Sequence, residues 1–272
     1  MRLKRFRQAM LGLVLSSAAL AQASPMPPAL ADAIAAPQRT EAFRARDVYR
    51  QPQETLAFFT VQPWMTVVEI WPGAGWYTEI LAPYLKDKGQ YIAAVFALNE
   101  ASPGYQGSTM TKFVEKLRAD PARYGSVGLS TLGGPDQWAI APPGSADRVL
   151  TFRNVHNWIE ADIAPQVFDA MFKALRKGGV LGVVEHRALP GTSIEQMKSS
   201  GYVTEAEVKR LALAAGFKFE SASEVNANPK DSTDHPKGVW TLPPRLALGE
   251  KDKAKYLAIG ESDRMTLRFV KP

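Results

Sequence analysis

Apolar positions along the chain alternate between short β-branched runs and longer segments with helical spacing. Strand patterns occur at 66–70, 91–96, 127–132, 147–152, 180–185, 217–225 and 265–270. Helical patterns occur at 76–85, 111–118, 163–175 and from Thr204 to Gly216, with one or two short helices within 40–59 that break near Pro52. Because strand patterns of period 2 alternate with helical patterns of period 3.6, the sequence predicts an α/β fold built from parallel βα units.

The organisation of the chain is simple. Its 272 residues lie near the upper range for one α/β domain, and no internal repeat is present. We expect a single domain over 39–272, preceded by a flexible Pro- and Ala-rich lead-in at 24–38. Within the domain, residues 226–263 show little periodicity apart from a short helical pattern at 251–259. A segment this long without periodicity predicts a functional loop or an insertion.

The N-terminus has the pattern of a secretory signal peptide. Four cationic residues within the first seven positions precede an apolar run over 9–20, and a small-x-small tripeptide ends at Ala23. The run is too short to span a bilayer, and no second span follows. We therefore expect cleavage after Ala23, a periplasmic or secreted protein and no membrane span thereafter. An uncleaved N-terminal anchor is the alternative.

Charge and cysteine content narrow the function classes. The formal charge of +6 comes from 33 cationic and 27 acidic residues, and removal of residues 1–23 leaves 29 against 27. A net charge of +2 does not indicate a nucleic-acid partner. The chain has no cysteine, which excludes disulfides, thiolate metal sites and a cysteine nucleophile.

A glycine turn follows the first predicted strand. Gly73 and Gly75 come directly after residues 66–70, where backbone N–H groups and a helix start can receive an anionic ligand. The dinucleotide-binding fingerprint is incomplete, because Thr78 stands at its third glycine and the next strand ends in Phe96 rather than an acid. Two glycines alone are also consistent with a simple tight turn.

The layout resembles the class I S-adenosylmethionine-dependent methyltransferases. The matching residues are Glu69 at the end of the first strand, the glycines Gly73 and Gly75, Asp136 before the fourth strand, and the segment 175–179 before the fifth. The strings VVEIWPGAGWYTEILAPYL and RMTLRFVKP resemble, more narrowly, a group of secreted bacterial proteins called predicted methyltransferases. The resemblance implies a three-layer, doubly wound, mostly parallel sheet of seven strands with an antiparallel last strand.

The same resemblance implies roles for individual residues. Glu69 would support the turn at the methionine end of the cofactor, Gly73 and Gly75 would line it, and Asp136 would accept a hydrogen bond from the adenine amino group. Two positions of this cofactor site depart from the family. Trp71 stands where most members have the first glycine, and Phe96 stands where an acid binds the ribose hydroxyls, which leaves that role to Asn99 or Glu100.

Candidate catalytic residues follow the fourth and fifth strands, at the edge where open α/β sheets bind ligands. We expect His156 to act as a general base and Asn154 to orient the substrate, with Glu185 in the same layer. Asn154 is also expected to contact the cofactor. The alternative is that these side chains cap the next helix and satisfy loop backbone. His156, Glu185 and His186 could also hold a metal, but the 30-residue gap between the histidines is no known ligand spacing, and we expect none.

Other polar and aromatic residues have simpler interpretations. A salt-bridged surface face, rather than a lid, is the interpretation for Arg44, Asp47, Tyr49 and Arg50. His235 is interpreted as a solvated loop residue. Trp76 and Tyr77 are interpreted as core or rim residues. No G-x-S-x-G motif is present, which disfavours an α/β-hydrolase.

Two functions remain. The first is an exported, S-adenosylmethionine-dependent methyltransferase that acts on a small molecule. The alternative is a catalytically inactive protein of the same fold that binds another ligand or partner in the periplasm.

Overall fold

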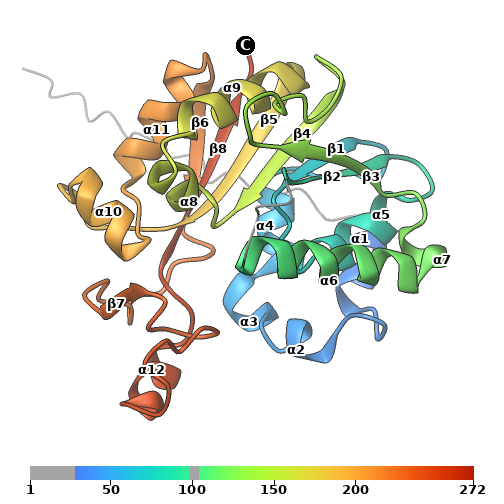
Figure 1. Ribbon diagram of the computed structural model, residues 1–272. Helices are drawn as coiled ribbons and strands as arrows, with labels where there is room; N and C mark the ends of the chain where they lie inside the picture. Colours follow the sequence, from blue (N-terminus) through green and yellow to red (C-terminus); the bar gives the residue numbers. More distant parts are fainter. Residues whose placement is uncertain (1–27, 98–103) are drawn as a thin grey trace, which may run out of the picture.

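A computed structural model describes residues 28–97 and 104–272 (Figure 1). The predicted signal peptide, the start of the lead-in, and Asn99 and Glu100 lie outside these residues. No helix in the described ranges is long and apolar enough to cross a membrane.

One seven-stranded sheet forms the centre of the molecule, in the order β3-β2-β1-β4-β5-β8-β6. Its strands are β1 Thr66–Ile70, β2 Gln90–Phe96, β3 Gly128–Leu132, β4 Ala146–Phe152, β5 Leu175–His186, β6 Lys218–Ser223 and β8 Arg264–Val270. The first five pair in parallel, whereas β8 runs antiparallel between β5 and β6. The predicted α/β fold, with its antiparallel last strand, is confirmed.

Helices cover both faces of the sheet and bury two apolar cores (Figure 1). Against one face pack α8 Val155–Glu160, α9 Ala164–Ala174 and α11 Glu205–Ala214. Against the other pack α1 Pro28–Ala35, α4 Pro52–Phe58, α5 Thr78–Leu85 and α6 Tyr105–Ala119. Alternate residues of β1 divide between the cores, since Val67 faces one and Val68 the other. This alternation is the period-2 geometry of a strand buried on both faces.

Short helices complete the structure: α2 Glu41–Arg44, α3 Asp47–Arg50, α7 Pro121–Tyr124, α10 Ile194–Ser200 and α12 Lys253–Ile259. The sequence analysis did not predict α10. Its start has a full capping box, in which the Ser193 hydroxyl accepts from the Gln196 backbone N–H and the Gln196 side chain accepts from the Ser193 N–H. A Ser-x-x-Gln pattern at 193–196 was the available signal.

Two segments differ from what their composition suggested. Residues 28–35, part of the expected lead-in, form α1, because Leu30 is fully buried and α1 packs against α5. The segment 226–263 contains β7 Pro236–Val239 and α12, and it lies beyond the end of β6 and the start of β8 (Figure 1). It is held there by buried polar residues, including Asn226, whose amide donates to Thr55 and Thr266.

The register of the sheet positions the site. Ile70 at the end of β1 lies beside Thr151 of β4, and Phe152 at the end of β4 lies beside Val184 of β5. The loops that leave these three neighbouring strands therefore meet at one edge.

Candidate functional site

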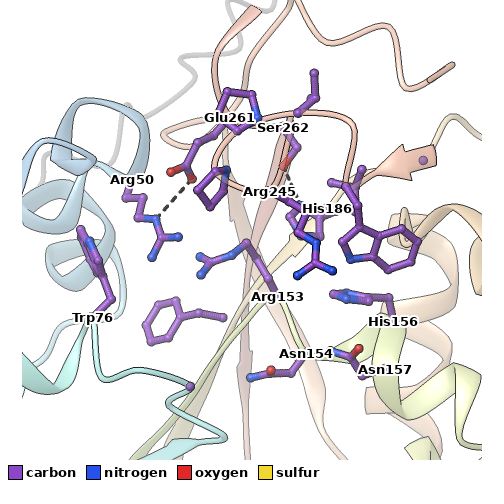
Figure 2. A pocket seen from close by; sticks show the side chains of 18 of the residues that line it. Arg50, Trp76, Arg153, Asn154, His156, Asn157, His186, Arg245, Glu261 and Ser262 are labelled. Atoms are coloured by element: carbon purple, nitrogen blue, oxygen red, sulfur yellow. Dashed lines mark hydrogen bonds and ion pairs between the residues drawn. The ribbon is translucent and has the colours of Figure 1, made fainter. Parts of the chain in front are cut away.

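A cavity of about 1030 Å³ opens at the carboxyl ends of β1, β4 and β5. The turn after β1 and the residues after β4 form its floor, helix α3 forms one side, and residues 235–247 form the opposite wall (Figure 2). Pockets for small molecules commonly have volumes of about 300 to 1000 Å³. This cavity is therefore large enough for a nucleoside together with a second small molecule.

The glycine turn presents its backbone to the cavity. Gly73 has φ of 59°, and a Cβ placed on it meets no atom within 4 Å, so the backbone at this position faces open space. Gly75 has φ of 83°, and its Cβ would lie 3.1 Å from the ring of Phe113. Both positions favour glycine, the first for its backbone conformation and the second also for close packing.

Two aromatic rings line the cavity at the two positions where the sequence departs from the methyltransferases that it resembles. Trp71 and Phe96 pack with ring centroids 4.6 Å apart, and the Trp71 indole N–H donates to the Leu132 carbonyl. Trp71 has φ of 46°, so an L-residue here occupies the backbone conformation usual for glycine. The result is an apolar surface at the β2 edge of the cavity, where the described residues place no carboxylate.

Glu69 is buried beneath the turn. The Tyr91 hydroxyl donates to its Oε2 at 2.5 Å, and the Thr78 hydroxyl lies 2.8 Å from that of Tyr91. Burial raises the pKa of the Glu69 carboxyl from 4.5 to about 7, and the hydrogen bond from Tyr91 opposes this rise. The carboxyl lines the cavity and titrates near neutral pH.

Asn154 connects β4 to the turn. Its amide nitrogen donates to the carbonyl of Ile70 at 2.9 Å and, more weakly, to that of Trp71 at 3.4 Å. Asn154 precedes helix α8, but its side chain does not cap that helix. Its side chain thus holds the backbone of the predicted cofactor turn, while the residue itself lines the cavity.

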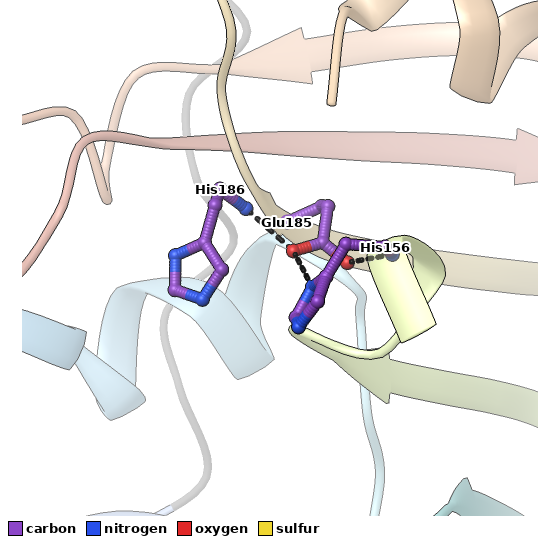
Figure 3. Close-up of side chains that lie close together, drawn as sticks. All are labelled: His156, Glu185 and His186. Atoms are coloured by element: carbon purple, nitrogen blue, oxygen red, sulfur yellow. Dashed lines mark hydrogen bonds and ion pairs between the residues drawn. The ribbon is translucent and has the colours of Figure 1, made fainter. Parts of the chain in front are cut away.

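His156, Glu185 and His186 form a compact cluster (Figure 3). Oε1 of Glu185 lies 3.0 Å from Nδ1 of His156 and accepts from the His186 backbone N–H, while Oε2 accepts from the His156 N–H. This fixed carboxylate favours the tautomer in which Nδ1 of His156 carries the proton and Nε2 is free to accept one. Among the described residues, no group bonds to Nε2 of His156.

The spacing argument against a metal was wrong in its premise. Ligand atoms of the three residues lie within 4.8 Å of one another, because β4 and β5 are neighbouring parallel strands. Burial, followed by the charges of His156 and of nearby arginines including Arg153, lowers the pKa of His186 well below its usual value, which favours the neutral ring. A neutral imidazole can accept a hydrogen bond or bind a metal.

Three earlier interpretations change with the structure. Asp136 is exposed in the loop after β3 and does not line the cavity, so it is not placed with the other predicted cofactor residues. His235 is not a solvated residue, since its side chain is 4% exposed, bonds to Asp231 and lies in the cavity wall. Arg50 does not belong to a surface face. It is 3% exposed, pairs with Glu261 and points into the cavity.

The sequence analysis missed the cationic character of this cavity. Arg46, Arg50 and Arg264 all pair with the single carboxylate of Glu261, whose pKa they lower to about 2 against the opposing effect of burial. Arg153 adds a fourth guanidinium nearby. Arg46 and Arg50 lie at the two ends of α3, Arg153 follows β4 and Arg264 begins β8, and no local pattern connects them.

The chain was compared with known proteins. No protein-family model and no curated protein sequence matches it. Among solved structures, it is similar to a SAM dependent methyltransferase from Aquifex aeolicus, with TM-score 0.53 and 16% identity over 84% of this chain and 93% of that chain. The chain has the methyltransferase fold.

Two further structures show the range of proteins that share this fold. The [4+2]-cyclase SpnF gives TM-score 0.55 and 13% identity over 82% of this chain and 81% of that chain. Phosphoethanolamine N-methyltransferase 2 from Haemonchus contortus, in complex with S-adenosyl-L-methionine, gives TM-score 0.51 and 15% identity over 89% of this chain and 60% of that chain. Because one of these proteins is a cyclase, the reaction must be argued from the site.

The Glu69 carboxyl predicts a pH dependence of stability. Its pKa is higher in the folded than in the unfolded chain, so its contribution is fully present below pH 4.5 and is lost as the pH rises through about 7. We expect Glu69→Gln to remove this loss. The free energy of unfolding of the variant minus that of wild type should increase by up to about 3 kcal/mol as the pH rises from 5 to 8.

Urea unfolding at both pH values measures this difference. Glu115→Gln, an exposed site on α6, is the matched control and should track wild type within about 0.5 kcal/mol. If the free energy of unfolding changed between pH 5 and pH 8 by the same amount in Glu69→Gln and wild type, the raised pKa would be contradicted.

Proposed function

We propose that the protein is an S-adenosylmethionine-dependent methyltransferase that acts on a small molecule. One observation carries the proposal: the glycine turn with Glu69 beneath it lines the same cavity as the His156–Glu185 pair. A nucleoside-binding element and a candidate proton acceptor thus face one space that is large enough for two ligands. The fold shared with methyltransferases supports the proposal.

The residues of the turn suit the methionine end of this cofactor. Gly73 offers open backbone, and Glu69 offers a carboxyl toward an ammonium or sulfonium charge. The faces of Trp71 and Phe96 suit an adenine ring or a positively charged sulfur. Phe96 supplies no hydrogen-bond acceptor for the ribose, so the ribose hydroxyls must bond to other groups. When bound, S-adenosylmethionine supplies an electrophilic methyl group.

The chain contributes positioning and one proton transfer. Methyl transfer depends mainly on holding the acceptor in line with the methyl carbon, which is a role for the residues that line the cavity. Nε2 of His156 accepts the proton from the acceptor nucleophile, and the buried carboxylate of Glu185 stabilises the resulting imidazolium. Asn154 fixes the position of the turn relative to His156 by donating to the Ile70 carbonyl at the end of β1.

Calorimetry with S-adenosylhomocysteine tests the cofactor assignment. We expect measurable binding to the wild-type protein and at least tenfold weaker binding to Glu69→Ala, since a hydrogen-bonding partner beneath the turn is lost. Glu115→Ala is the control and should bind as wild type does. Absence of heat from wild type at millimolar ligand would overturn the proposal and favour the alternative of a binding protein without this activity.

Turnover tests the role of His156. With a panel of small acceptors and S-adenosylmethionine labelled in the methyl group, His156→Gln should lower the rate by about 100-fold or more. Its affinity for S-adenosylhomocysteine should stay within about twofold, because the base does not hold the nucleoside. Equal loss of binding and turnover would instead indicate a structural role.

Export is part of the proposal. The cationic start, the apolar run over 9–20 and the small residues ending at Ala23 support cleavage before Ser24. N-terminal sequencing of protein from an expressing bacterium should begin at Ser24 in the envelope or medium fraction. A protein that retains Met1 would contradict cleavage, and recovery in the cytoplasmic fraction would contradict export.

A further inference from the structure

Arg153 is a cation that has no hydrogen-bonding partner for its side chain within residues 28–97 and 104–272. The residue follows directly on β4 and lines the cavity, yet its guanidinium makes no hydrogen bond or ion pair with any residue that the structure describes. Figure 2 shows its side chain extending toward Arg50 and Glu261, and the guanidiniums of Arg50 and Arg245 reaching the same space. Neighbouring Glu261 is already shared by Arg46, Arg50 and Arg264.

The backbone at Arg153 is also unusual. Its φ is 60°, a left-handed conformation that L-residues with long side chains rarely adopt, and its N–H donates to the Val184 carbonyl at 2.7 Å. Strained backbone of this kind tends to occur at ligand sites, where the surrounding structure enforces it. Here the conformation directs an arginine into the cavity at the point where β4 ends.

The cavity as a whole is positively charged. Five described lining residues are cationic, namely Arg46, Arg50, Arg153, Lys237 and Arg245, and two are carboxyls, Glu69 and Glu261. Behind the walls, Arg264 adds one positive charge, and Glu185 and Asp231 each add one negative charge. With Glu69 ionised, these described groups leave an excess of two positive charges at the cavity.

S-adenosylmethionine does not neutralise this charge. It carries a sulfonium, an ammonium and one carboxylate, so binding adds one net positive charge to the cavity. The second ligand must then be negative for the filled cavity to be electrostatically favourable. A guanidinium without a partner suits a carboxylate or phosphate, which it can bind through two parallel hydrogen bonds.

We infer that Arg153 is the binding residue for a carboxylate or phosphate group of the methyl acceptor, so that the protein acts on small anionic molecules. This inference rests on the proposed function and specifies its substrate class. Arg50 lies beside Arg153 and would flank the anion, and the Arg153 side chain lies on the Glu261 side of the cavity (Figure 2). In the same view Asn154, which holds the cofactor turn, lies apart from the Arg50–Glu261 pair (Figure 2).

Titration calorimetry with inorganic phosphate at constant ionic strength tests the site. Wild type should bind one phosphate, and Arg153→Gln should bind it about ten- to a hundredfold more weakly. Arg153→Asn is a second variant, because asparagine tolerates the left-handed backbone and preserves the fold. Arg44→Gln removes the same charge from an exposed neighbour outside the cavity and should leave phosphate affinity within about twofold. No phosphate binding by wild type, or equal binding by Arg153→Asn, would overturn the site.

A second titration tests whether Arg153 binds an anionic group of the methyl acceptor or the carboxylate of the cofactor. Arg153→Asn should bind S-adenosylhomocysteine within about twofold of wild type, with or without saturating phosphate. The contrasting ligand is 5′-methylthioadenosine, which lacks the carboxylate of S-adenosylhomocysteine. If Arg153→Asn bound S-adenosylhomocysteine at least tenfold more weakly than wild type but bound 5′-methylthioadenosine equally well, Arg153 would hold the methionine carboxylate. The inference would then be wrong.

The two titrations also distinguish failure of the inference from failure of the proposed function. Binding of S-adenosylhomocysteine without phosphate binding would overturn the anion site and leave the proposed methyltransferase intact. Phosphate binding that depends on Arg153, without any binding of S-adenosylhomocysteine, would overturn the assignment to a methyl acceptor and would contradict the proposed function.

Discussion

Parallel pairing of β4 with both β1 and β5 is the constraint on which the site depends. Because the three strands run in the same direction, the residues that follow each of them emerge at one edge of the sheet. The glycine turn comes from β1, the residues Arg153 to His156 follow β4, and Glu185 ends β5. Strands buried on both faces hold this edge rigid, so side chains far apart in sequence keep fixed positions relative to one another.

Buried carboxyls organise that edge in three different ways. Glu185 uses both oxygens to hold His156, which leaves one nitrogen of the ring for chemistry. Glu261 gathers three arginines from α3 and β8 and so fixes the wall that the segment 226–263 contributes. Among the described residues, no cation lies within hydrogen-bonding distance of Glu69, and burial raises its pKa to about 7. A carboxyl with pKa near neutrality and an arginine without a partner are unusual in a stable core, and both line the same cavity.

Much of the fold could be predicted from local patterns. Each strand of the sheet was located within a few residues except β5, which begins at Leu175 rather than near 180, because its first residues carry Arg176, Lys177 and two glycines. Helix α1 was missed because it is only eight residues long and lies in a Pro- and Ala-rich stretch, and it is ordered by burial of Leu30. The segment 226–263 looked irregular because its order comes from buried side-chain hydrogen bonds, which leave no periodic pattern.

The sequence by itself determined the α/β class, the glycine turn and the presence of His156 and Glu185 at strand ends, since periodicity and turn chemistry are local properties. Only the tertiary structure decided which of these residues meet. It joined two histidines separated by 30 positions, placed Asp136 outside the cavity and turned Arg50 inward. It also left Arg153 unpaired within the described chain. The physical reason is that charge pairing and burial are summed over all neighbours in space, and sequence separation does not limit which residues those are.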